Sequence, residues 1–177
     1  MLLAACICVW ISCRLPGKPK DQIKSIEIAT DGCLAGCPVI AIRIDSSLTL
    51  KYHGGFNAVP KGFYSGVVTQ GFWDTLNVKL KQINFKKLDT AQYYSIDGEV
   101  AEAIFYWDSH KRHIFKSIYE NPDSVSSVLI WIINSYKHID PHKLKDSVKF
   151  ETTYQNMQPP ILIEDHVLFP PPKKRRK

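Results

Sequence analysis

The stretch Asp31–Asp45, DGCLAGCPVIAIRID, decides the fold more clearly than any other part of the chain. In its second half, Ile40, Ile42 and Ile44 alternate with other residues, so they would share one face of a β-strand. Its first half places Cys33 and Cys37 four positions apart, in a turn that leads into this strand. Alternation after a tight turn is typical of a strand in an antiparallel sheet with one face on the core.

The same alternation recurs on both sides of this stretch. It predicts further strands over residues 23–30, 48–54 and 63–69, in addition to the strand over 38–45. It also predicts a hairpin formed by residues 100–107 and 113–120, with residues 108–112 as its turn. Short connections between successive strands favour a mainly antiparallel sheet.

Two segments have the period of a helix instead. Phe72, Leu76, Leu80 and Ile83 form one stripe, which predicts a helix from about Gln70 to Ile83 with Thr69 as its N-cap. The second helix would begin at Asn121-Pro122-Asp123, with Asn121 as cap and Pro122 at the first helical position, and would end at Asp140-Pro141. Its apolar face would consist of Val125, Val128, Leu129, Ile132 and Tyr136.

This order predicts an α+β fold of two layers, with a mainly antiparallel sheet of about six strands and both helices on one face. Residues 23–140 would form this single domain. Residues 1–13 would be a signal segment, 14–22 a flexible linker, 141–169 a peripheral extension and 170–177 a basic disordered tail. Within the extension, SVKFETTY (147–154) and ILIEDHVLF (161–169) are expected to be peripheral strands.

The positive charge of the chain is concentrated at its end. The 177 residues have a net charge of +6, but residues 173–177, KKRRK, supply five of the positive charges. The remainder has 18 basic and 17 acidic residues, so it offers no basic face for specific nucleic-acid binding. The tail itself is expected to be solvated, or to touch anionic lipid or polymer without specificity.

The N-terminal segment has the features of a membrane-targeting signal. The uncharged run Met1–Ser12 is too short to span a bilayer and ends at Cys13, after which a Pro- and Gly-containing linker begins. This arrangement resembles a bacterial lipoprotein signal, in which the cysteine is lipidated. Cys13 is the preferred residue, and Cys6 is the alternative because Leu3-Ala4-Ala5-Cys6 is closer to the usual lipidation motif. A cleaved secretory signal and a buried N-terminal element remain open.

Four motifs together resemble a bacterial domain of unknown function, family 6438. They are Cys33-x-x-x-Cys37-Pro38-Val39, Tyr52-His53-Gly54, the G-x-x-S-G of Gly62–Gly66, and the F-x-x-L of Phe85–Leu88, within residues 24–139. The family usually has a glycine two positions after the first cysteine, where this chain has Ala35, and often an aromatic residue where it has Ile40. The resemblance implies no activity, since none is established for the family. Its members look like short envelope proteins, often with lipoprotein-type signals.

Cys33 and Cys37 admit two interpretations. In an oxidising compartment, two cysteines in one turn can close a disulfide that stabilises the loop. The alternative is a catalytic dithiol, but thioredoxin-type sites have two intervening residues and a helix N-terminus, whereas here three residues intervene between strands. We therefore expect a structural disulfide.

Other kinds of site are weakly supported. Asp108, His110 and His113 could provide metal ligands, but nothing places them near the cysteines, and a solvated turn is the simpler interpretation. Asp97 and Glu99 are two carboxylates in a predicted loop. The sequence contains no common phosphate-binding loop and no G-x-S-x-G motif. No catalytic residue, metal or cofactor is expected.

The sequence thus predicts a protein of the bacterial cell envelope, either facing the periplasm or attached to the outer membrane. It would be tethered to the membrane through a lipid anchor and act as a non-catalytic binding or interaction module. Its partner would be an envelope protein or a glycan. The alternative is a thiol–disulfide redox protein that uses Cys33 and Cys37.

Overall fold

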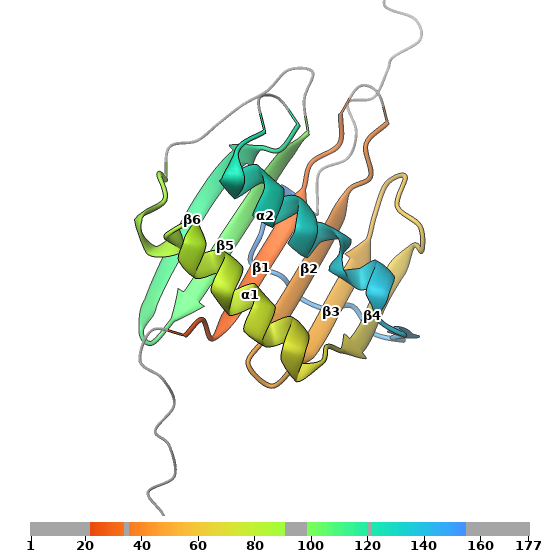
Figure 1. Ribbon diagram of the computed structural model, residues 1–177. Coiled ribbons are helices and arrows are strands. Elements are labelled where there is room, and N and C mark those ends of the chain that lie inside the picture. Colours follow the sequence, from red (N-terminus) through yellow and green to blue (C-terminus); the bar gives the residue numbers. More distant parts are fainter. Residues whose placement is uncertain (1–21, 34–35, 91–98, 120–121, 155–177) are drawn as a thin grey trace, which may run out of the picture.

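The computed structural model describes residues 22–33, 36–90, 99–119 and 122–154, which form one antiparallel sheet with two helices (Figure 1). The strands lie in the order β6-β5-β1-β2-β3-β4-β7, and every neighbouring pair is antiparallel. Their bounds are β1 Ser25–Thr30, β2 Ile40–Asp45, β3 Thr49–Gly54, β4 Gly62–Val67, β5 Val100–Trp107, β6 His110–Ser117 and β7 His142–Lys143. The prediction of an α+β fold with a mainly antiparallel sheet is confirmed.

The two helices, α1 (Gln70–Gln82) and α2 (Ser124–Ile133), lie on one face of the sheet (Figure 1). Short 3₁₀ turns follow each of them, η1 (Phe85–Lys87) and η2 (Asn134–His138). The main core lies between helices and sheet, where Ile26 pairs with Ile44 and Ile28 with Ile42, as the alternation predicted. The helices contribute Trp73, Leu76, Leu80, Val128, Leu129 and Ile132 to this core. Burying these aliphatic and aromatic side chains provides the main driving force for folding.

Helix α1 begins as predicted, whereas α2 does not. The Thr69 hydroxyl accepts a hydrogen bond from the Phe72 backbone N–H at 3.1 Å, which confirms Thr69 as N-cap. The cap of α2 is Asp123, whose carboxylate accepts from the Ser126 backbone N–H at 2.8 Å. The prediction of Asn121 as cap was therefore wrong, because a carboxylate two residues later reaches the same kind of backbone donor. Helix α2 also ends earlier than expected, at Ile133, and continues as η2.

The β5–β6 hairpin is tighter than predicted. Trp107 pairs with His110, so only Asp108 and Ser109 form the turn. Asp108 has a φ of 47°, a left-handed conformation that aspartate tolerates better than most residues. Residues 110–112, expected to be part of the turn, instead belong to strand β6.

Residues 148–154, which we call the docked segment, do not form the expected strand. They lie on the face of the sheet opposite the helices, and the blue end of the ribbon passes behind the sheet in Figure 1. Phe150 and Tyr154 pack there in a second, smaller core with Ala29, Ala41 and Val100. Both faces of the sheet are therefore partly covered. The predicted strand over 161–169 lies outside the described residues.

Candidate functional site

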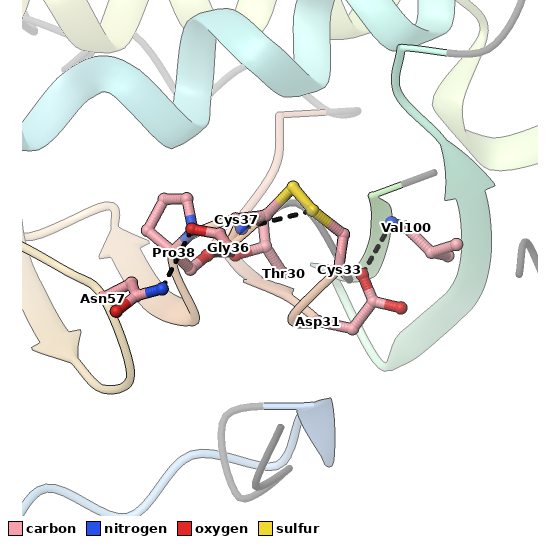
Figure 2. Close-up of a disulfide and its surroundings, with 8 residues drawn as sticks. All are labelled: Thr30, Asp31, Cys33, Gly36, Cys37, Pro38, Asn57 and Val100. Carbon is pink, nitrogen blue, oxygen red and sulfur yellow. Dashed lines mark hydrogen bonds between the residues drawn. A yellow bond between two sulfur atoms is a disulfide. The ribbon is translucent and has the colours of Figure 1, made fainter. Parts of the chain in front are cut away.

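The turn that carries the two cysteines is cross-linked. The sulfurs of Cys33 and Cys37 lie 2.04 Å apart in a disulfide that spans the turn between β1 and β2 (Figure 2). The Gly36 N–H donates to the Cys33 carbonyl at 3.0 Å, and the Cys37 N–H donates to Cys33 Sγ at 3.2 Å. The sequence-based prediction of a disulfide agrees with this geometry.

Neighbouring side chains hold the cysteine turn from both sides (Figure 2). The Thr30 hydroxyl donates to the Pro38 carbonyl at 2.7 Å, and Asn57 Nδ2 donates to the Gly36 carbonyl at 3.1 Å. Gly36 has a φ of +86°, and a Cβ there would lie 3.2 Å from Asn57 Nδ2. Both facts favour glycine at position 36. This accounts for the glycine that follows Ala35 in this chain.

Two carboxyl groups lie close to this turn. Asp31 accepts a hydrogen bond from the Val100 N–H at 2.7 Å, which joins the end of β1 to the start of β5. Burial, followed by repulsion from the Asp31 carboxylate, raises the pKa of Glu99 to about 7. Burial also raises the pKa of Asp31, against the effect of the Val100 hydrogen bond. Glu99 lies outside any strand, directly before β5, in agreement with the predicted loop, but its side chain is buried. Asp97 lies outside the described residues.

The sheet face opposite the helices carries two fully buried carboxylates, which sequence reasoning missed. Glu27 in β1 and Glu102 in β5 are both inaccessible to solvent. Arg43 Nε donates to Glu27 at 2.8 Å, and His113 Nε2 lies 2.8 Å from Glu102. We call the surface formed by these four residues the carboxylate face. The signal was a single acidic residue inside each apolar strand, IEIA and VAEAIF.

The docked segment binds the carboxylate face through its backbone. Glu27 Oε1 accepts the Thr152 N–H at 2.6 Å. Glu102 Oε2 accepts the Thr153 N–H at 2.6 Å and the Tyr154 N–H at 2.9 Å. The Thr152 and Thr153 hydroxyls donate to the same two oxygens, at 3.1 and 3.0 Å. Three successive amides thus meet two buried carboxylates, and hydrogen bonds to ionised acceptors are stronger than neutral ones.

Two aromatic rings anchor the docked segment. Phe150 and Tyr154 are each only 5% exposed, and both pack near the paired residues Ala29 and Ala41. The small alanine side chains leave space for a ring on the sheet. The Arg43 guanidinium lies 5.4 Å from the centre of the Phe150 ring, and the Phe115 ring meets Tyr154 edge-on at 5.5 Å.

A cleft of about 490 Å³ opens beside the end of the docked segment. It is lined by Thr90, Lys111, Arg112, His113, Phe115 and Thr153. Its basic groups already have partners, since Lys111 pairs with Glu151 and Arg112 donates to the Leu88 carbonyl at 2.9 Å. The cleft adjoins the carboxylate face, because His113 belongs to both.

The histidines of the β5–β6 hairpin do not form a metal site. His110 stacks on Trp107 with ring centres 5.5 Å apart, whereas His113 contacts Glu102. His113 lies in strand β6, in agreement with the predicted strand over 113–120, and its ring contacts a buried carboxylate. Among the described residues, no group of three histidine, cysteine or acidic side chains could hold a metal ion.

Residues 24–139 match a family described as a domain of unknown function, DUF6438. The chain belongs to the DUF6438 family. The match includes the cysteine turn, both helices and all four residues of the carboxylate face. It ends before β7 and before the docked segment, so the part of the chain that covers the carboxylate face lies outside the DUF6438 match. No curated protein matches the chain. None of the helices within the described ranges is long and apolar enough to cross a bilayer.

Proposed function

We propose that this DUF6438 protein is a membrane-tethered, non-catalytic interaction module of the bacterial cell envelope. The observation that supports it best is the carboxylate face, which holds a short, bent piece of chain through backbone amides and two aromatic anchors. Protein surfaces that bind peptides can combine the same two features, backbone hydrogen bonds for affinity and side-chain pockets for specificity.

The tether is proposed from the sequence of residues 1–13, which lie outside the described residues. The uncharged run that ends at Cys13 supports lipidation of that cysteine. A lipid anchor would hold the domain near the membrane and raise its effective concentration toward other envelope components. The partner would then be an envelope protein or a glycan.

One experiment tests the tether and the interaction together. A photo-crosslinking amino acid replaces Lys111, at the edge of the carboxylate face, or Lys81, an exposed residue of α1 on the other side of the sheet. In cells, the protein should be found in the membrane fraction and Cys13→Ser should release it. Adducts identified by mass spectrometry should form from position 111, and Cys13→Ser should reduce them at least fivefold.

Each element of this proposal has its own contradicting result. If Cys6→Ser releases the protein and Cys13→Ser does not, the lipidated residue is Cys6. Retention of both single variants in the membrane fraction would contradict the lipid anchor. The absence of adducts from both crosslinking positions, in a protein that is folded and membrane-bound, would contradict an interaction module.

The alternative function, thiol–disulfide exchange, is favoured by one contact. The Cys37 N–H that donates to Cys33 Sγ would also stabilise a thiolate at Cys33. We nevertheless expect a structural role, because the disulfide closes a turn that Thr30 and Asn57 also hold by hydrogen bonds, and because this turn lies between two strands. The double change Cys33→Ser with Cys37→Ser should lower the free energy of unfolding by about 2 kcal/mol, since the closed ring is small. The circular dichroism of the sheet should be unchanged.

The rate of thiol alkylation against pH distinguishes the two functions. After mild reduction, a structural pair should reach its half-maximal rate no lower than about pH 8.5, the pKa of an ordinary cysteine. A half-maximal rate well below this pH, together with disulfide-reductase activity that the double variant lacks, would establish the redox function instead.

A further inference from the structure

We propose that the carboxylate face is the binding groove for a short segment of a partner protein, and that the docked segment is its intramolecular occupant. This inference rests on the proposed interaction function and names the surface and the partner. The partner segment has the chemistry of residues 148–154. It carries two aromatic side chains four positions apart, and the backbone N–H groups of the second aromatic residue and of the two residues before it are free to donate to the carboxylates.

The hydrogen bonds of the groove can be made by segments of different sequence, because their donors are backbone N–H groups. Glu27 and Glu102 accept the amides of residues 152, 153 and 154, and every residue except proline supplies such an amide. The two threonine hydroxyls add contacts to the same oxygens. A segment from another chain could therefore make the same bonds if it entered in the same direction.

The side-chain contacts of the groove provide selectivity. The surface around Ala29 and Ala41 accommodates aromatic rings, and Arg43 lies over the first ring. Phe115 meets the second ring edge-on. Ring contacts of this kind contribute about 0.5–1.5 kcal/mol beyond the burial of area. An occupant without the two aromatic residues would lose both anchors.

The groove can open without leaving a buried charge unpaired. Glu27 keeps Arg43 as a partner and Glu102 keeps His113, and both partners come from the sheet itself. Water would solvate the carboxylates once the segment left. The docked segment is joined to β7 through residues 144–147, of which Lys145, Asp146 and Ser147 are exposed and Leu144 donates a hydrogen bond to the Phe63 carbonyl. Its departure would therefore not disrupt the main core between sheet and helices.

The cleft beside Thr153 extends the groove past the second aromatic residue. Lys111, Arg112 and His113 line it, and the segment itself supplies Glu151 to neutralise Lys111. When the segment leaves, Lys111 loses that partner. A partner segment with an acidic residue before its second aromatic residue, or just after it, would complement this charge.

The test uses the full-length chain with Thr152→Pro and Thr153→Pro, which removes two of the three donated amides. The matched control, Thr152→Val with Thr153→Val, keeps both amides and loses only the hydroxyls. The probe is a fluorescein-labelled peptide of residues 146–156, followed by fluorescence anisotropy. The tethered segment has an effective concentration in the millimolar range. In the wild type and in the valine control it should therefore compete strongly with the labelled peptide for the groove. The proline variant should bind the probe at least 50-fold more tightly than either.

The specificity of the site is tested with a second probe. A peptide in which Phe150→Ala and Tyr154→Ala are combined should bind the proline variant at least tenfold more weakly. A folded proline variant that binds neither probe would overturn the proposal, as would equal binding of both probes. A wild-type dimer in solution that dissociates in the proline variant would assign the groove to a second copy of this chain and would equally overturn it.

Hydrogen exchange of the wild type tests the proposal independently, even if the proline variant fails to fold. The amides of residues 152–154 should exchange through local opening, at least 100-fold faster than the slowest amides of β1 and β5. If they exchange only with global unfolding, the docked segment is a permanent part of the fold and the proposal fails. Crosslinked adducts from position 81 alone would preserve the interaction function but contradict this groove.

Discussion

Replacing Glu102 with alanine should lower the free energy of unfolding by about 3 kcal/mol. Glu102 is inaccessible to solvent and accepts hydrogen bonds from two backbone amides and one threonine hydroxyl of the docked segment. Hydrogen bonds to a charged group contribute about 1.5–3 kcal/mol each, so their loss should release the segment. The loss of stability is limited, because the backbone amides of the released segment then form hydrogen bonds with water. Urea denaturation measures the change, and 3 kcal/mol corresponds to a melting temperature lower by about 6–12 °C.

Glu151→Ala is the matched control for Glu102→Ala. Glu151 lies in the same region and pairs with Lys111, but both side chains are about half exposed. Exposed ion pairs contribute about 0–1 kcal/mol. Trypsin cleavage at Lys149 gives a second readout, since Glu102→Ala should accelerate it and Glu151→Ala should not. Equal losses of stability for the two variants would show that Glu102 does not hold the segment.

Glu99→Gln should stabilise the protein at pH 8 and leave its stability nearly unchanged at pH 4. Burial and Asp31 raise the pKa of Glu99 from 4.5 to about 7, so the folded state binds this proton more strongly than the unfolded state. The protonated Glu99 side chain therefore contributes to the free energy of unfolding. This contribution is fully present below about pH 4.5 and is lost as the pH rises to about 7 and above. A shift of this size corresponds to about 3 kcal/mol, which solvent screening reduces to about 2–3 kcal/mol.

Urea denaturation at pH 4, 6 and 8 tests the Glu99 prediction. The stability of the wild type should decrease across this series by more than that of Glu99→Gln. Other groups that titrate near Glu99 are Asp31, whose raised pKa acts in the same direction at lower pH, and Tyr119, whose raised pKa keeps it neutral throughout. Glu151→Gln, at an exposed position, is again the control. If the two variants follow the same pH dependence, Glu99 is ionised in the folded protein at neutral pH.

The cysteine turn shows how far local sequence reasoning reaches at a site. Spacing and flanking strands predicted a disulfide between Cys33 and Cys37, and the two sulfurs are bonded. The proximity of Asp31 and Glu99 was not predicted, although both positions are adjacent to predicted strands. Their encounter depends on β1 pairing with β5, and some seventy residues separate the two strands in the chain.

The sequence by itself determined the layers of this fold. The alternation of Ile26, Ile28, Ile40, Ile42 and Ile44 specifies which face of each strand is apolar, and the stripe from Phe72 to Leu80 does the same for α1. These patterns suffice because the period of a strand or helix is a property of neighbouring residues. The order of strands then follows largely from short antiparallel connections.

Only the tertiary structure decided the role of the other sheet face. Glu27 and Glu102 have the pattern of solvent-facing residues in half-buried strands, and residues 147–154 alternate like a further strand. The amides of that segment could have paired with a strand edge. Instead they meet carboxylates, and Thr152 contacts a residue 125 positions earlier in the chain. Every buried backbone amide needs a hydrogen-bond acceptor. The sequence around the amide does not identify that acceptor, because the acceptor depends on how distant parts of the chain fold against one another.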